Sequence, residues 1–314
     1  MPTIPSEDEV LAYFERCSNW GRWGPDDQLG TMNFLTPDSR RAAAGLVRDG
    51  ISVSCSRRIP KGYEEDFTMP PLHYMVNSGE CFAGEETPPD SLQISTDFIG
   101  LEFHGFAVTH LDALAHLFRD GKMYNGLSAD RVTTSAGATV HAIDNLRDGV
   151  VGRGVLLDIP AQRGVPWLDP SAGVYPEDLE AAEEHAGVRV RTGDILLCRF
   201  GTMARRNAEG PSKAVFSARP GLHASCLPWL HQREIAVLGS DSAQDLYPSG
   251  YLRLRAPMHQ VGIVAMGLWL LDNCDLEPLA EACRRAGRWE FLLAIGPLRI
   301  TNGTGSPVNP IAVF

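Results

Sequence analysis

The chain has 314 residues, of which 44% are hydrophobic and 21% charged, and its formal net charge is −11. This composition allows a large buried core in one or two domains, and the acidic balance without a basic stripe excludes nucleic acid and anionic membranes as expected partners. No apolar run approaches the roughly 20 residues that cross a bilayer, and no signal peptide is recognisable, so we expect a cytoplasmic protein.

The first fifty residues predict a helical extension. Residues 6–16 have an amphipathic pattern, with Ser6 as N-cap and Glu9 three residues later. A loop rich in Gly, Pro, Asp and Trp follows, and Pro37 begins a second predicted helix. We therefore assign residues 1–50 to an N-terminal extension and loop, and residues 51–314 to the main domain.

The sequence of the main domain predicts strands and helices that alternate irregularly. Residues 60–96 carry many Pro, Gly and acidic residues and little periodicity, which we interpret as a flap over a pocket. Apolar runs predict buried strands at residues 100–108, 152–160, 193–201 and 234–241. Helices are predicted at residues 176–186, 223–232, 258–271 and 276–286, before strands and turns at the carboxyl terminus. The pattern predicts a single mixed α/β domain with peripheral helices.

The stretch HGFAVTHLDALAH, which runs from His104 to His116, concentrates ionisable residues. On a strand, His110 and Asp112 point to the same face, with Cα atoms roughly 6.6 Å apart. If a helix begins near Asp112, His116 lies one turn further on, above that aspartate. The pattern therefore predicts that an imidazole, a carboxylate and a second imidazole share one cavity.

Each of these residues alone has a simpler interpretation. A single buried histidine is typically a hydrogen-bonded core residue, and Asp112 at the end of a strand is typical of a helix cap. Together they favour chemistry, because burying three ionisable groups costs several kcal/mol unless a partner such as a divalent cation pairs them. His104 would lie about 20 Å from His110 in an extended chain, too far to share an ion, unless Gly105 bends the chain.

The segment THLDALAH resembles the second half of the motif H-x-G-T-H-x-D-x-P-x-H of the cyclase-type metal-dependent hydrolases, a family that includes bacterial kynurenine formamidase and isatin hydrolase. Other stretches are similar to the family in the same order over residues 18–300. They are NWGRWGPDDQLGTMN, GKMYNG, GRGVLLDIP, TGDILLCRFG, RPGLH, GSDS and PMHQVGIVAMGLWLLDNCDLEPL. The resemblance implies a compact swivelling β/β/α-type fold, a homo-oligomer and one or two zinc or manganese ions.

The resemblance also implies roles for individual residues in a cyclase-like catalytic domain. His110, Asp112, His259 and Asp272 would be metal ligands, and His116 would be the acid/base. His259 and Asp272 are thirteen positions apart, about 3.6 turns, which would put them on nearly opposite faces of one helix. A break between them, near residue 267, is therefore expected.

Two departures from the family pattern affect the site. Phe106 occupies the position of the leading histidine ligand, and Asp272 stands where the family has a glutamate. We therefore expect one divalent ion, Zn or Mn, rather than two. Phe106 would form an aromatic wall that suits a flat aromatic substrate, although core packing is an alternative for any single phenylalanine.

Four further residues are candidates for the pocket rim, with loop anchoring as an equal alternative: Trp20, Trp23, Tyr124 and Asn125. Seven dispersed cysteines without Cys-x-x-Cys spacing indicate a reduced setting. The absence of G-x-S-x-G and G-x-G-x-x-G motifs disfavours a serine hydrolase and a dinucleotide enzyme.

Three functions remain open from the sequence. The first is a hydrolase that opens a C–N (amide, formamide or cyclic imide) or lactone bond of a small aromatic substrate with metal-activated water. The second is a cyclase, dehydratase or isomerase that uses His110, Asp112 and His116 for proton transfer with little or no metal. The third is a non-catalytic protein that binds a small molecule. We expect the protein to act as a dimer or tetramer.

Overall fold

A nine-stranded mixed sheet organises the computed structural model, which describes residues 4–83, 90–211 and 217–314. The strand order is β1-β15-β13-β7-β9-β11-β12-β4-β14. In that order the strands are Ser52–Ser54, Ile311–Val313, Glu290–Ile295, Val150–Asp158, Ile195–Arg199, Val237–Ser240, Trp269–Asp272, His110–Asp112 and Gly305–Pro307. The central strands β7, β9, β11 and β12 are parallel, and the outer strands pair antiparallel.

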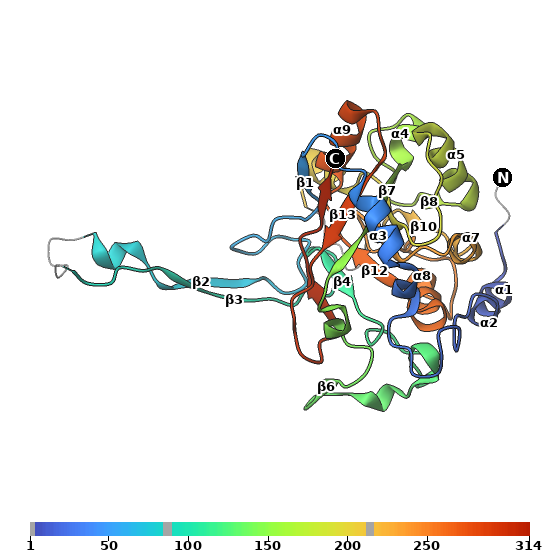
Figure 1. The fold of residues 1–314 in the computed structure, drawn as a ribbon, viewed down its shortest axis with the longest axis horizontal. Coiled ribbons are helices and arrows are strands. Elements are labelled where there is room, and N and C mark those ends of the chain that lie inside the picture. The colour runs from blue at the N-terminus through green and yellow to red at the C-terminus, as the bar shows by residue number, and fades with distance from the viewer. Residues whose placement is uncertain (1–3, 84–89, 212–216) are drawn as a thin grey trace.

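Helices connect the parallel strands and cover the sheet (Figure 1). The longer helices are α3 (Pro37–Ala44), α5 (Pro176–Ala186), α6 (Thr202–Glu209), α7 (Cys226–Arg233) and α9 (Glu277–Ala286). The short helix α4 (Ile159–Arg163) packs against α5, and both α3 and α5 pack on β7. Every residue of β9 and β11 is buried, as expected for strands between covering layers. The predicted mixed α/β fold is confirmed.

The amino-terminal segment is tied to the main body. It forms α1 (Glu7–Leu11) and α2 (Tyr13–Arg16), so the predicted first helix is interrupted at one residue. Asn19 Nδ2 donates to the Met266 carbonyl at 2.8 Å, and Thr31 Oγ1 donates to the Gly267 carbonyl at 3.1 Å. Among the described residues, no helix combines the length and hydrophobicity that a bilayer span requires.

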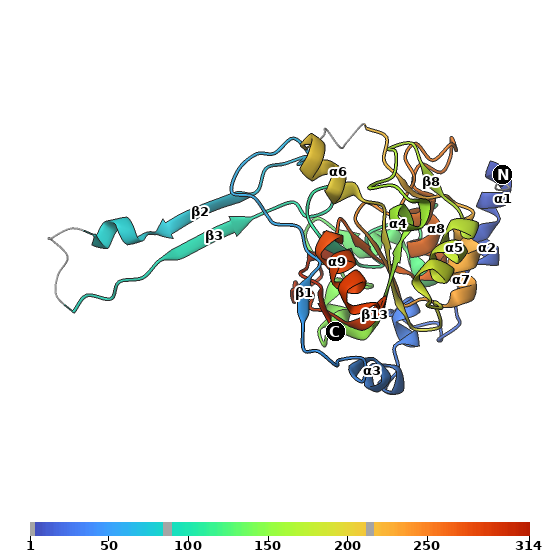
Figure 2. The same ribbon diagram turned by 90° about the horizontal axis from the view of Figure 1, so that it is seen from above.

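A two-stranded arm projects from the body (Figures 1 and 2). It is built by β2 (Leu72–Asn77) and β3 (Thr96–Gly100), which pair antiparallel. Side chains on both strands, including Tyr74 and Phe98, are exposed. The prediction of a flap over a pocket is therefore wrong for this hairpin, because it points away from the body rather than across it.

Two predicted elements, the strand at residues 100–108 and the helix at residues 258–271, are replaced by other structures. Residues 101–109 form bends rather than a strand, and Gly105 has a φ of +143°, a conformation that residues with a side chain rarely adopt. The predicted helix at residues 258–271 is instead α8 (Pro257–Val261), a π-helical turn (Gly262–Met266) and the buried strand β12. Gly267, with φ +64°, makes the reversal between helix and strand, which confirms the expected break.

Candidate active site

Two paired strands bring the first three ionisable residues of the site together. In the antiparallel register of β4 and β12, His110 lies opposite Asp272, and Asp112 lies opposite Leu270. His110 and Asp112 share one face of β4, and all three polar side chains are buried. One ligand atom from each of them lies within 4.8 Å of the other two, so the group could hold a metal ion.

His259 joins this group from α8. Its Nε2 lies 3.3 Å from Asp272 Oδ2 and 3.6 Å from Asp112 Oδ2. Its Nδ1 donates to Asp245 Oδ2 at 2.6 Å, which fixes the ring and directs Nε2 toward the other carboxylates. A histidine held by a carboxylate at one nitrogen is the usual arrangement around a metal ligand.

His116 and His104 form the other side of the site. No helix begins at Asp112; a turn in which the His116 amide donates to the Ala113 carbonyl carries His116 back instead. His116 Nε2 lies 4.0 Å from Asp112 Oδ1. The expectation that His104 lies too far away is wrong, because the bend at Gly105 places its Nδ1 2.9 Å from the same oxygen. His104, Asp112 and His116 make a second group that could hold an ion.

The polar atoms at the centre of the site fit a cation. Both carboxylate oxygens of Asp112 and Nδ1 of His104 are buried, and among the described residues they make no hydrogen bond of standard geometry, although His104 Nδ1 lies 2.9 Å from Asp112 Oδ1 as an ion pair. His110 donates from Nδ1 to the Val108 carbonyl at 2.8 Å, which leaves Nε2 facing Asp112 at 3.4 Å. Uncompensated buried acceptors are costly, so oxygen and imidazole nitrogen atoms gathered in this way could hold a metal ion.

The electrostatics of the site follow from its carboxylates and its burial. Burial by itself would lower the pKa of His110, but Asp112 and Asp272 raise it to about 9. Burial likewise opposes the positive form of His259, yet the neighbouring carboxylates hold its pKa well above the ordinary value. The site therefore requires positive charge, which bound protons or a metal ion can supply.

The pKa of His116 shifts in the opposite direction. Burial, together with the positive charges of the neighbouring histidines, lowers its pKa to about 4, although Asp112 acts against this shift. The side chain remains 27% exposed, more than that of any other histidine that contacts Asp112. His116 is therefore neutral near pH 7 and is the most accessible of these histidines.

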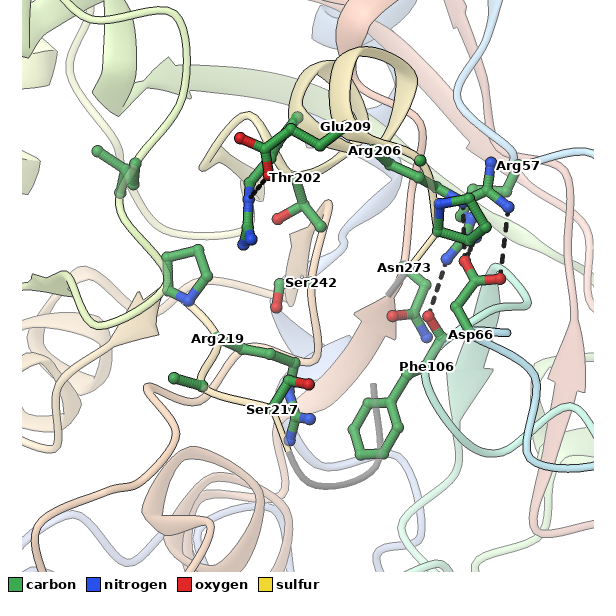
Figure 3. Close-up of a pocket in the computed structure, with 16 residues that line it drawn as sticks. Arg57, Asp66, Phe106, Thr202, Arg206, Glu209, Ser217, Arg219, Ser242 and Asn273 are labelled. Atoms are coloured by element: carbon green, nitrogen blue, oxygen red, sulfur yellow. Dashed lines mark hydrogen bonds and ion pairs between the residues drawn. The ribbon is translucent and has the colours of Figure 1, made fainter. Parts of the chain in front are cut away.

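A cavity of about 280 Å³ lies near this group, although none of the four candidate metal ligands lines it (Figure 3). Asn273, which directly follows Asp272, lines it together with Phe106. Phe106 does not project from a strand beside the ligands, because its segment bends; its ring lies 3.9 Å from the guanidinium of Arg219. The described residues that line it are Arg57, Asp66, Phe106, Leu168, Thr202, Arg205, Arg206, Glu209, Gly210, Pro211, Ser217, Ala218, Arg219, Pro220, Ser242 and Asn273.

The four candidate rim residues do not line this cavity but anchor loops. Trp20 Nε1 donates to the Val264 carbonyl at 2.7 Å, and the ring of Trp23 packs edge-on against Phe34. Tyr124 is fully buried and donates to Asp27 Oδ2 at 3.1 Å.

Asn125 has φ +59° and links two loops. Its Nδ2 donates to the carbonyls of Gly24 and Pro25 at 3.0 Å, and its Oδ1 accepts from the Gly21 amide at 2.7 Å. The contacts of all four residues therefore agree with the alternative that they anchor loops.

Sequence reasoning missed three residues of the site. Asp245 orients His259, Gln244 Nε2 donates to Asp272 Oδ1 at 3.0 Å, and Arg219 lies over Phe106. The dense segment GSDSAQD, which contains two of them, was the available signal, but nothing in its spacing indicates which histidine it would meet.

Comparisons with known proteins agree with this fold. Residues 45–244 match the model of the family described as Cyclase. A crystal structure of a novel cyclase is similar with 32% identity and a TM-score of 0.86, covering 95% of this chain and 99% of that one. Isatin hydrolase A from Labrenzia aggregata, bound to benzyl benzoate, is similar at 19% identity and a TM-score of 0.60, covering 86% and 94%.

A third structure, a predicted metal-dependent hydrolase from Bacillus stearothermophilus, is similar at 15% identity and a TM-score of 0.52, covering 84% of this chain and 98% of that one. A comparison with curated proteins found no match. The family model covers more than half of the 314 residues, and the expected resemblance is confirmed. The chain belongs to the Cyclase family.

Proposed function

We propose that this protein is a metal-dependent hydrolase of a C–N or lactone bond in a small aromatic substrate. His110, Asp112, His259 and Asp272 would hold one Zn²⁺ or Mn²⁺, and His116 would act as acid/base. The observation that carries the proposal is the buried carboxylate of Asp112, around which four imidazoles gather, His104 Nδ1 as close as 2.9 Å.

The chemistry divides between the ion and the protein. When bound, a divalent ion would polarise a carbonyl and lower the pKa of a water molecule toward ~7. His116, neutral near pH 7, would take a proton at Nε2 during attack and return it to the leaving nitrogen or oxygen. His104, stacked on the His116 ring with centroids 4.0 Å apart, would restrict that ring to one orientation.

The comparisons support this proposal at the level of the fold. A relative with the same fold is named as an isatin hydrolase, and another as a predicted metal-dependent hydrolase. Isatin hydrolysis opens a cyclic amide, which is one of the bond types proposed for this chain. Identities of 19% and 15% leave the substrate to experiment.

The test combines metal analysis with a substrate panel. Protein purified without added metal is analysed for zinc and manganese, then assayed on a formanilide, a cyclic imide and an aromatic lactone. We expect about one ion per chain, hydrolysis of at least one panel member, and loss of activity on chelation. His116→Asn should lower kcat by about 10²- to 10⁴-fold, the range of general acid–base catalysis, while the ion stays bound.

His73→Ala is the matched control, because His73 lies on the arm and its Nε2 contacts Asp97 at 2.7 Å, outside the site. Hydrolysis that survives complete removal of metal but vanishes in His116→Asn would overturn the proposal in favour of metal-free proton transfer. Binding of panel members without turnover would overturn it in favour of a binding protein.

We also propose that the protein is a homo-oligomer. The supporting observation is the arm, whose exposed apolar side chains on β2 and β3 include Leu72, Tyr74, Phe98 and Ile99. Large exposed apolar patches mark interaction sites. We expect sedimentation velocity to show a dimer or tetramer. Replacing Tyr74 and Phe98 with serine should shift the population toward monomer. A monomeric wild-type protein would contradict the proposal.

A further inference from the structure

The cavity beside the site is rich in positive charge. Among the described residues, its lining contains four arginines (Arg57, Arg205, Arg206 and Arg219) and two acidic residues (Asp66 and Glu209). With Glu64, which pairs with Arg206 from outside the lining, these groups leave an excess of one positive charge. The whole chain carries a formal charge of −11. A concentration of guanidinium groups in a cavity of an acidic protein favours an anionic ligand there.

Two of these arginines build the cavity wall. Arg57 and Arg206 both pair with the buried carboxylate of Asp66, and Arg57 Nη1 donates to the Phe106 carbonyl at 2.8 Å. Arg57 therefore ties the bend that carries Phe106 to this ion-pair cluster, whose contacts Figure 3 marks with dashed lines. The aromatic face of the cavity is therefore held in place by buried ion pairs.

Arg219 is positioned by aromatic rings. Its guanidinium carbon lies 3.9 Å from the Phe106 ring centroid and 4.8 Å from that of Tyr247. Ring stacking uses the faces of a guanidinium, whereas its N–H donors lie in its plane and suit bidentate recognition of a carboxylate. Figure 3 shows Arg219 beside the Phe106 ring at the cavity.

Two hydroxyl groups give an independent indication of a ligand. Ser242 is 2% exposed, and its Oγ has no hydrogen-bond partner among the described residues. Thr202 is only partly buried, but its Oγ1 atom is buried and likewise has no described partner. Both residues line the cavity, and Figure 3 shows Ser242 between Thr202 and Arg219. Buried hydroxyls without partners require an acceptor that the protein itself does not provide.

We propose that this cavity binds the carboxylate of an aryl acid, with Ser242, Thr202 and Arg219 donating to the carboxylate and the ring lying against Phe106. Leu168 and Pro220 supply further apolar lining. This inference rests on the proposed function in one respect. If the protein is a hydrolase, its substrate is an aromatic acid whose reactive bond reaches toward Asp272, which precedes the cavity residue Asn273 in the sequence.

The test uses benzoate and its neutral analogue benzamide as probes, titrated into the full-length protein by calorimetry, with and without added Zn²⁺. Benzoate should bind at least tenfold more tightly than benzamide in both conditions. Arg219→Gln and Ser242→Ala should each weaken benzoate binding about tenfold, with little effect on benzamide. Arg41→Gln is the matched control, because Arg41 is exposed on α3.

Equal binding of the two probes, or unchanged benzoate affinity in a folded Ser242→Ala variant, would overturn the proposal. Ser242→Ala removes only a hydroxyl that makes no described hydrogen bond, so it remains informative if Arg219→Gln does not fold. Benzoate binding that persists in a protein with no hydrolytic activity would support this inference while contradicting the proposed function. The two can therefore fail separately.

Discussion

The imidazole rings of His104 and His116 stack with their centroids 4.0 Å apart and their planes inclined by only 7°. Both rings face Asp112, which lies between them in the sequence. The contact depends on the bend at Gly105, because an extended segment would carry His104 away from the site. A side chain two positions before Phe106 thus reaches the site that the family motif would fill from position 106.

His104→Ala tests this contact. We expect metal affinity to fall about 10- to 100-fold, because the Nδ1 of His104 lies 2.9 Å from a carboxylate oxygen of the proposed ligand Asp112. Competition with a chromophoric chelator measures the affinity, and His73→Ala on the arm should leave it unchanged. Equal zinc affinity in His104→Ala and wild type would show that His104 does not support the ion.

Asp245→Asn tests the orientation of His259. The amide keeps the size of the side chain but removes the negative charge that holds His259 Nδ1 at 2.6 Å. We expect metal affinity to fall about 10- to 100-fold with a small change in the folded structure. The same chelator assay applies, with Asp97→Asn on the arm as the control. An unchanged affinity would mean that His259 needs no carboxylate partner.

Gly267→Ala should destabilise the fold. A Cβ at this position would lie 2.6 Å from the Tyr124 ring, and φ is +64°. Gly287→Ala is the matched control, since Gly287 has φ +61° but open space around the added Cβ. Backbone strain costs each variant about 1 kcal/mol, and the overlap should cost Gly267→Ala a further 1–3 kcal/mol. Urea unfolding measures the free energy of unfolding of both variants. A similar loss of stability in the two would show that the contact with the Tyr124 ring adds no cost.

The burial of the cysteines predicts which thiols a reagent will modify in the folded protein. All seven are free; Cys81 is exposed and the other six are buried. Burial raises the pKa of Cys17 to about 11 and of Cys55 to about 12, so these thiols stay protonated and unreactive as the pH rises from 7 to 9. A thiol reagent should modify one cysteine in the native protein, none in Cys81→Ser, and seven after unfolding. Rapid native labelling of several thiols would contradict the described burial.

Local patterns identified much of the fold. Continuous apolar runs predicted β7, β9 and β11, a capping pattern predicted the helix at α1, and Pro37 predicted the start of α3, because these signals lie within a few neighbouring residues. The prediction of a strand at residues 100–108 failed because the segment bends: Ala107 and Val108 pack with Phe67 in a small separate apolar cluster, and Phe106 lines the cavity. Periodicity cannot distinguish such packing from a strand.

The sequence by itself determined the family, the mixed fold and the pairing of His110 with Asp112, since two-residue spacing on a strand is a local geometric fact. Only the tertiary structure decided which distant residues meet them. The antiparallel register of β4 and β12 places Asp272 opposite His110, and packing between segments far apart in the sequence brings Asp245 to His259 and Arg219 to Phe106. These contacts arise from the arrangement of whole elements, and no spacing along the chain encodes them.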